Sequence, residues 1–116
     1  MQYLMLIYSR ESDDPKPGTP EGDKLYGDYM KFTEDVTQRK LMLGSNALQP
    51  VSTATTVRVR QGKTQTTDGP FAETKEQLGG YYLLDCKDLD EAIAWAARIP
   101  SARYGSVEIR PVMLFE

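Results

Sequence analysis

The chain has 116 residues, the size of one domain, so we predict a single domain over residues 1–116. Seventeen acidic against fourteen basic residues give a net charge of −3, which argues against a nucleic-acid-binding protein because such proteins present a basic surface. The chain has no histidine and a single cysteine, Cys86, which excludes histidine-dependent catalysis, histidine- or cysteine-rich metal sites and an internal disulfide.

The lone cysteine predicts a protein of the reducing cytoplasm, and nothing in the composition predicts a metal or another cofactor. No apolar run approaches the ~20 residues that a membrane span requires. The N-terminal segment has neither the basic flank nor the cleavage pattern of a signal peptide, so we expect no membrane partner.

Residues 2–8, QYLMLIY, predict a first strand that is apolar on both faces. Tyr3, Met5 and Ile7 share one face, and the residues between them share the other, so the strand needs cover on both sides. The polar, proline-containing segment over residues 9–18 follows as the best candidate for a mobile loop.

A long helix is predicted after this loop. Thr19 is a suitable N-cap and Pro20 suits the first helical position, while Gly44 predicts the end of the helix. One apolar stripe should face the core, made of Leu25, Tyr29, Phe32 and Val36.

The middle of the chain predicts a hairpin and a third main strand. Residues 55–60 are β-branched, and residues 61–63 turn the chain into a short return strand over 64–67. The third main strand covers residues 78–86. Its glycine pair, Gly79 and Gly80, indicates a bulge or the close approach of another group.

A second helix and a last strand complete the chain. Asp88 is the predicted N-cap, Glu91 completes a capping box, and Pro100 stops the helix. The last strand is expected over residues 106–115. The buried stripe of the helix should consist of Leu89, Ala92, Ile93, Ala96 and Ala97.

The order of these elements predicts an α+β fold, a ferredoxin-like β-α-β-β-α-β arrangement with an inserted hairpin. Two helices can cover only one face of an antiparallel sheet, yet the first strand is apolar on both faces. An exposed apolar patch of that size favours a second copy packed sheet to sheet. We therefore predict a homodimer that encloses a pocket for a small-molecule ligand.

The segment DGPFAETKEQLGGYYLLD, residues 68–85, strongly resembles the signature of the DGPF family within the YCII-related proteins. The resemblance extends over nearly the whole chain and implies a dimeric α+β barrel. It implies little about activity. The wider group is associated with a His-Asp pair in a cleft; Asp68 matches the aspartate, but this chain has no histidine. The resemblance also implies a genomic setting near extracytoplasmic-function sigma factors, and hence a regulatory association with a sigma factor.

Asp68 is the candidate catalytic residue, acting as an acid–base in the dimer cleft, although an aspartate before Gly-Pro also serves as a turn-former. Ser45 and Asn46 are additional polar candidates, and Cys86 is interpreted as a small buried hydrophobe. The candidate ligand-binding residues are Gly69, Pro70, Phe71, Glu73, Lys75 and Tyr81. The alternative interpretation is turn formation for Gly69 and Pro70, and packing for Phe71 and Tyr81. For Glu73 and Lys75 it is a solvated charged loop.

Three function classes stay open from the sequence. One is a small-molecule enzyme of unknown reaction that uses Asp68 as its acid–base. Another is a non-catalytic ligand-binding or regulatory module, and the third is a structural interaction protein. The absence of histidine favours the second class over the first. A cavity beside a buried Asp68 would favour the enzyme.

Overall fold

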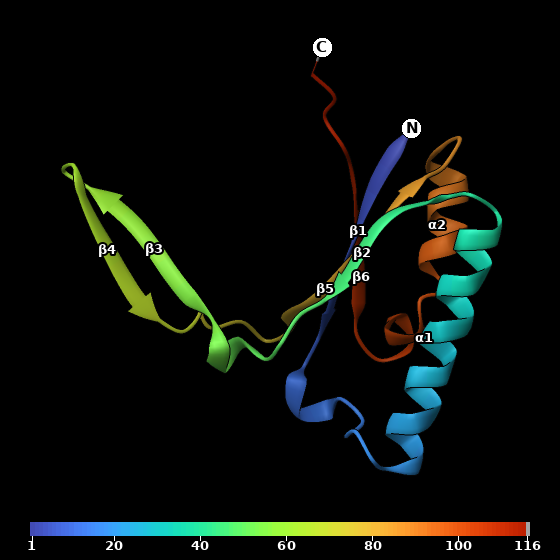
Figure 1. Cartoon of the computed structure of the whole chain (residues 1–116), viewed down its shortest axis with the longest axis horizontal. Helices are drawn as coiled ribbons and strands as arrows, with labels where there is room; N and C mark the ends of the chain where they lie inside the picture. The colour runs from blue at the N-terminus through green and yellow to red at the C-terminus, as the bar shows by residue number, and fades with distance from the viewer. Residues whose placement is uncertain (116) are drawn as a thin grey trace.

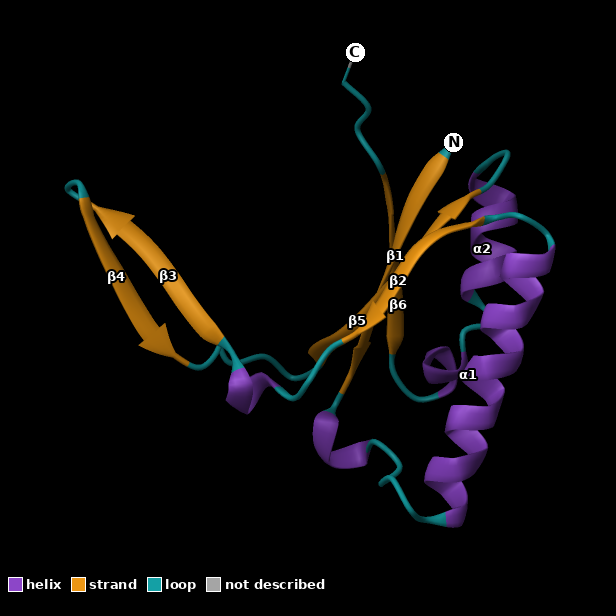
Figure 2. Ribbon diagram, in the orientation of Figure 1, coloured by secondary structure: helices purple, strands orange, loops and turns teal. Residues whose placement is uncertain are grey.

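The described residues form six strands and two α-helices (Figures 1 and 2). The α+β class and the two helices are as the sequence predicts, and there is one strand more than predicted. The computed structural model describes residues 1–115. The main sheet has the antiparallel strand order β2-β5-β1-β6, and β3 and β4 form a separate hairpin. The elements are β1 (Gln2–Ser9), α1 (Pro20–Gln38), β2 (Met42–Ala47), β3 (Thr55–Arg60), β4 (Lys63–Asp68), β5 (Gln77–Asp85), α2 (Leu89–Ala96) and β6 (Ser106–Pro111), with 3-10 turns at Glu11–Asp13, Val51–Thr53 and Pro100–Arg103.

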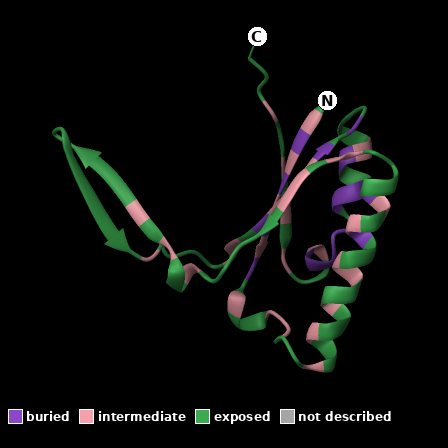
Figure 3. Cartoon of the chain, viewed as in Figure 1, coloured by how far each residue is buried: buried purple, intermediate pink, exposed green. Residues whose placement is uncertain are grey.

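Both helices cover the same face of the main sheet (Figure 2). The buried side chains gather between the helices and this face, as Figure 3 shows. Phe32 of α1 is the centre of this core, because its ring packs edge-on against Tyr82 of β5 at 5.0 Å and against Trp95 of α2 at 6.1 Å between ring centroids. From β1, the alternate residues Tyr3, Met5 and Ile7 point into the core, as predicted.

The opposite face of the main sheet is apolar and only half-buried. Leu4, Leu6 and Tyr8 of β1 alternate with the core residues and therefore point away from the helices. Leu83 of β5 lies directly across from Leu4 and extends this surface. We call this face the open face of the sheet.

The hairpin β3–β4, which we call the arm, stands apart from the main sheet on the side away from the helices (Figure 1). Its tight turn uses Gln61 and Gly62, both with positive φ, as a two-residue hairpin loop requires. The radius of gyration is 16.1 Å, compared with ~13 Å for a compact chain of this length. The predicted inserted hairpin is thus present, and it projects from the body of the protein.

The prediction that the first helix ends near Gly44 was wrong. Helix α1 ends at Gln38, and the chain then passes through Lys40, whose φ is 60°. The amide of Leu41 bonds back to the Val36 carbonyl at 2.9 Å, which closes the helix in a Schellman-type turn. Residues 42–47, predicted as the end of the helix and an irregular segment, form β2, so this strand takes the place in the main sheet that the prediction gave to residues 55–60.

The predicted stripe of α2 was wrong in part. Leu89 and Ile93 are each half exposed, and Ala97 is exposed, whereas Trp95 is buried. The large Trp95 ring sets the rotation of the helix, because it fits between Phe32 and the guanidinium groups of Arg39 and Arg98. The predicted members that do pack into the core are Ala92 and Ala96.

The last strand is also shorter than predicted. It ends at Pro111, and the amide of Val112 makes one further bond to the Gln2 carbonyl at 2.9 Å. Beyond this point β1 has no residues left to pair with. The apolar side chains of Met113, Leu114 and Phe115 are therefore exposed.

Replacing Lys40 with glycine should stabilise the fold, because glycine adopts positive φ without the steric cost that a lysine carries. We expect Lys40→Gly to raise the free energy of unfolding by about 0.5–1 kcal/mol. Lys31→Gly, at an exposed position inside α1, should lower it by about 1 kcal/mol. Urea unfolding at one protein concentration measures both, and a destabilised Lys40→Gly protein would contradict this account of the helix end.

Candidate functional site

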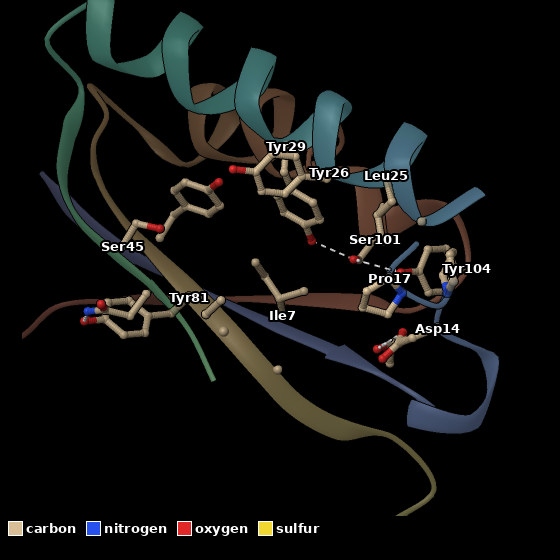
Figure 4. A pocket seen from close by; sticks show the side chains of 18 of the residues that line it. Ile7, Asp14, Pro17, Leu25, Tyr26, Tyr29, Ser45, Tyr81, Ser101 and Tyr104 are labelled. Carbon is tan, nitrogen blue, oxygen red and sulfur yellow. Dashed lines mark hydrogen bonds between the residues drawn. The ribbon is translucent and has the colours of Figure 1, made fainter. Parts of the chain in front are cut away.

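A cavity of about 510 Å³ lies between the N-terminal half of α1 and the main sheet (Figure 4). It exists because the two helices differ in length: α1 has 19 residues and α2 has 8. On the N-terminal side of Phe32, only the 3-10 turn at Pro100–Arg103 and the loop over residues 14–18 fill the space beside α1. These two segments close the cavity at one end.

Tyrosine rings and aliphatic side chains contribute to a largely apolar cavity wall. Tyr26 and Tyr29 enter from α1, and Tyr104 enters from the segment that follows the 3-10 turn (Figure 4). Ile7 from β1 and Leu25 from α1 add aliphatic surface. A wall of this composition favours an apolar or aromatic guest.

Hydroxyl groups are paired with one another at one end of the cavity. The Ser101 hydroxyl is hydrogen-bonded to the Tyr29 hydroxyl at 2.6 Å and to the Tyr104 hydroxyl at 3.2 Å. Nearby, the Ser9 hydroxyl donates to the Asp14 carboxylate at 2.7 Å. Burial raises the pKa of both Tyr29 and Tyr104, and the Asp14 carboxylate further raises the pKa of Tyr104. Both phenols therefore stay protonated at neutral pH.

At the opposite end, strands β2 and β5 supply Ser45, Asn46 and Tyr81 (Figure 4). The Asn46 amide donates to the Tyr81 hydroxyl at 2.8 Å. The strands approach closely at Gly80, where an added Cβ would lie 2.8 Å from the Asn46 carbonyl oxygen. Its neighbour Gly79 sits at a register shift between β1 and β5. The predicted bulge and close approach at the glycine pair are both confirmed.

The predicted site residues from Asp68 to Lys75 lie elsewhere. Asp68 is the exposed last residue of β4, at the base of the arm. Gly69 has a φ of 99°, and its amide donates to the Ala54 carbonyl, so it shapes a turn. The side chain of Phe71 is 77 % exposed. The remaining predicted residues of this segment, Pro70, Glu73 and Lys75, are also exposed.

The structure therefore separates the predicted site residues into two groups. Residues 68–75 share one exposed segment between the arm and β5, and none of them lines the cavity. Tyr81 contributes to the cavity lining, together with Ser45 and Asn46, which the sequence singled out as polar candidates. Tyr81 pairs with Leu6 and Asn46, however, so the side chains of Tyr81 and Asn46 belong to the open face of the sheet, whereas Ser45 pairs with the core residue Tyr82.

Sequence reasoning missed several polar cavity residues, among them Asp14, Tyr29, Ser101 and Tyr104. Tyr29 fits the apolar stripe of α1, which conceals its hydrogen-bonding role. Asp14 belongs to a segment that resembles a plain polar loop, and Ser101 and Tyr104 follow Pro100 without any motif. Only their tertiary contacts bring them together.

Cys86 is buried, as predicted, and burial raises the pKa of its thiol. Within residues 1–115, no group of three or more His, Cys, Asp or Glu side chains is placed to hold a metal ion. None of the described helices combines the length and the apolar character needed to cross a bilayer.

Two comparisons relate the chain to known proteins. A family profile described as the YCII-related domain matches residues 1–116. An uncharacterized protein of Rhizobium meliloti (strain 1021) is 40% identical over 118 residues, which cover 100% of this chain and 95% of that relative.

The buried Tyr29 phenol should stabilise the fold most strongly below pH 10, because burial raises its pKa and disfavours its ionised form. The folded state holds the Tyr29 proton more tightly than the unfolded chain, so this contribution is complete below the unfolded pKa near 10 and declines as the pH rises toward the raised folded pKa. We expect Tyr29→Phe to lower the free energy of unfolding by about 1 kcal/mol at pH 8. The difference in free energy of unfolding between the native protein and Tyr29→Phe should be smaller at pH 10.5 than at pH 8.

Urea unfolding of both proteins at the two pH values checks this expectation. A difference that stays constant, or grows, would mean that burial does not raise the pKa of Tyr29.

Proposed function

The chain belongs to the YCII-related family, and we propose that it is a small-molecule-binding protein whose ligand occupies the cavity between α1 and the main sheet. One observation carries the proposal: a cavity of about 510 Å³ with a largely apolar wall, which includes several tyrosines, and a few polar groups. Ligand sites typically measure ~300–1,000 Å³ and have this kind of lining.

The polar groups of the cavity are hydrogen-bonded to one another, which favours ligand binding over catalysis. Tyr29, Ser101 and Tyr104 satisfy one another, and Asp14 accepts from Ser9. Such a network orients hydrogen-bonding groups toward a guest but offers no free nucleophile beside a base. The non-catalytic, ligand-binding alternative is therefore the function that we adopt.

The finer assignment to the DGPF group is also our proposal, supported by the residues DGPFAETKE at positions 68–76. An acid–base role for Asp68 would need a second subunit to enclose it, because its side chain is exposed in the single chain. Association with a sigma factor and a cytoplasmic location remain predictions from the resemblance and the composition.

We further propose a homodimer with the dimeric α+β barrel arrangement and a ferredoxin-like protomer. The strand order β2-β5-β1-β6, with a helix after β1 and another after β5, supports the protomer fold. The open face, with Leu4, Leu6 and Leu83 half-buried, supports the dimer, because stacking two such faces would remove this apolar surface from water.

Filling the cavity should abolish ligand binding without unfolding the protein. Ser45 lines the cavity at its β2 end, so we expect Ser45→Phe to lower the affinity for naphthylmethanol, a neutral aromatic probe, at least about tenfold. Isothermal titration calorimetry measures the affinity, and circular dichroism verifies the fold.

The matched control is Ser52→Phe, at an exposed position outside the cavity, which should bind the probe like the native protein. If the native protein does not bind the probe, or if both variants bind it equally well, the proposed cavity function is wrong.

A charge placed on the open face should separate the subunits. We expect Leu83→Asp to sediment as a monomer at micromolar concentration, while the native protein sediments as a dimer, because burying an unpaired carboxylate between two sheets is unfavourable. Leu89→Asp, on the exposed side of α2, should leave the dimer intact. A native protein that sediments as a single protomer would rule out the dimer.

A further inference from the structure

Carboxylates are the only fully charged side chains in the wall of the cavity. Asp14 and Asp23 contribute to the lining, and no lysine or arginine does so among the described residues. We propose that the cavity selects an aromatic ligand that carries a protonated amine, with the ring held among the tyrosines and the ammonium group directed to Asp14. This inference rests on the proposed function and specifies its ligand class.

The N-terminus of α1 lies at the cavity and would by itself favour an anion. In this chain, the partial positive charge at the N-terminus of α1 is already offset by its own cap and by acidic side chains. The Gly22 amide donates to the Thr19 hydroxyl at 3.1 Å, and the first turn carries Glu21 and Asp23. These groups reduce the attraction of this helix end for an anion such as a carboxylate or phosphate.

The aromatic wall favours a cation as well as a flat ring. Tyr26 and Tyr29 of α1 face the same space as Tyr104, so a ring between them can stack on one phenol and meet another edge-on (Figure 4). The faces of phenol rings attract cations, because the ring quadrupole places negative charge on the face. A protonated amine next to these rings gains from this attraction, whereas a carboxylate does not.

Asp14 is the group best placed to receive the ammonium. It lies at the same end of the cavity as Tyr104, opposite Ser45 (Figure 4). The Ser9 hydroxyl donates to one carboxylate oxygen at 2.7 Å, which holds the side chain in place. A carboxylate can accept several hydrogen bonds, so this contact leaves capacity for an ammonium donor.

Three probes that share a naphthyl ring test the charge preference: naphthylmethylamine, naphthylmethanol and naphthoate. Near neutral pH the first is cationic, the second neutral and the third anionic. We expect calorimetric affinity for the amine to exceed that for the alcohol at least about tenfold, because a hydrogen bond to a charged partner is stronger than one between neutral groups. Naphthoate should bind most weakly.

Asp14→Asn should reduce the affinity for the amine to about that for the alcohol, while leaving the affinity for the alcohol unchanged. Asp13→Asn is the matched control: it removes the same charge one residue away, outside the cavity, and should retain the preference for the amine. Asp23→Asn provides a second variant should Asp14→Asn fail to fold by circular dichroism, and it should also weaken the preference.

The possible failures are distinguishable. If none of the three probes binds, both the proposed function and this inference are overturned. If the alcohol binds but the amine binds no tighter, or if naphthoate binds best, only the charge preference is overturned. Equal effects of Asp14→Asn and Asp13→Asn would assign the preference to the net charge of the protein and overturn the role of Asp14.

Discussion

The packing of two unequal helices on one face of the sheet is the constraint on which the rest of this structure depends. At ~1.5 Å per residue, α1 spans about 28 Å and α2 about 12 Å. Phe32, between Tyr82 and Trp95, marks the place where both helices meet the sheet. Toward its N-terminus, α1 is beside no other α-helix among the described residues, only the 3-10 turn at Pro100–Arg103, and the cavity lies in this region.

Polar groups in the cavity wall are compatible with this largely apolar setting because they satisfy one another. Tyr29, Ser101 and Tyr104 come from α1, a 3-10 turn and the segment that follows it, so their hydrogen bonds also join these elements. The same contacts that stabilise the wall fix the orientation of the hydroxyl groups. In the proposed function, the stability of the wall and the recognition of a ligand would therefore rest on one network in this region.

The open face and the cavity meet near Tyr81. This residue follows the buried Gly80 in β5, lines the cavity and accepts a hydrogen bond from Asn46. A second subunit stacked on the open face would therefore approach one end of the ligand site. The arm projects on the same side of the sheet, so it would bring the exposed segment over residues 68–75 toward a partner in the proposed dimer. In this arrangement the dimer and the site are physically linked.

Local signals in the sequence determined much of the fold. Thr19 and Asp88 cap the two helices as predicted, the hairpin forms at residues 61–62, and Gly79 marks the bulge. These features depend on backbone chemistry within a few residues, which a sequence displays directly. The end of α1 escaped prediction because Lys40 takes a left-handed conformation that usually belongs to glycine.

Only the tertiary structure decided where the cavity lies and which residues line it. The sequence drew attention to Asp68 and its neighbours, whose turn chemistry is conspicuous along the chain, and these residues are exposed. Asp14, Tyr29 and Ser101 carry no local signal. They share a site because helices of different length leave a space at one end of a sheet, and residues as distant as 29 and 101 meet there across it.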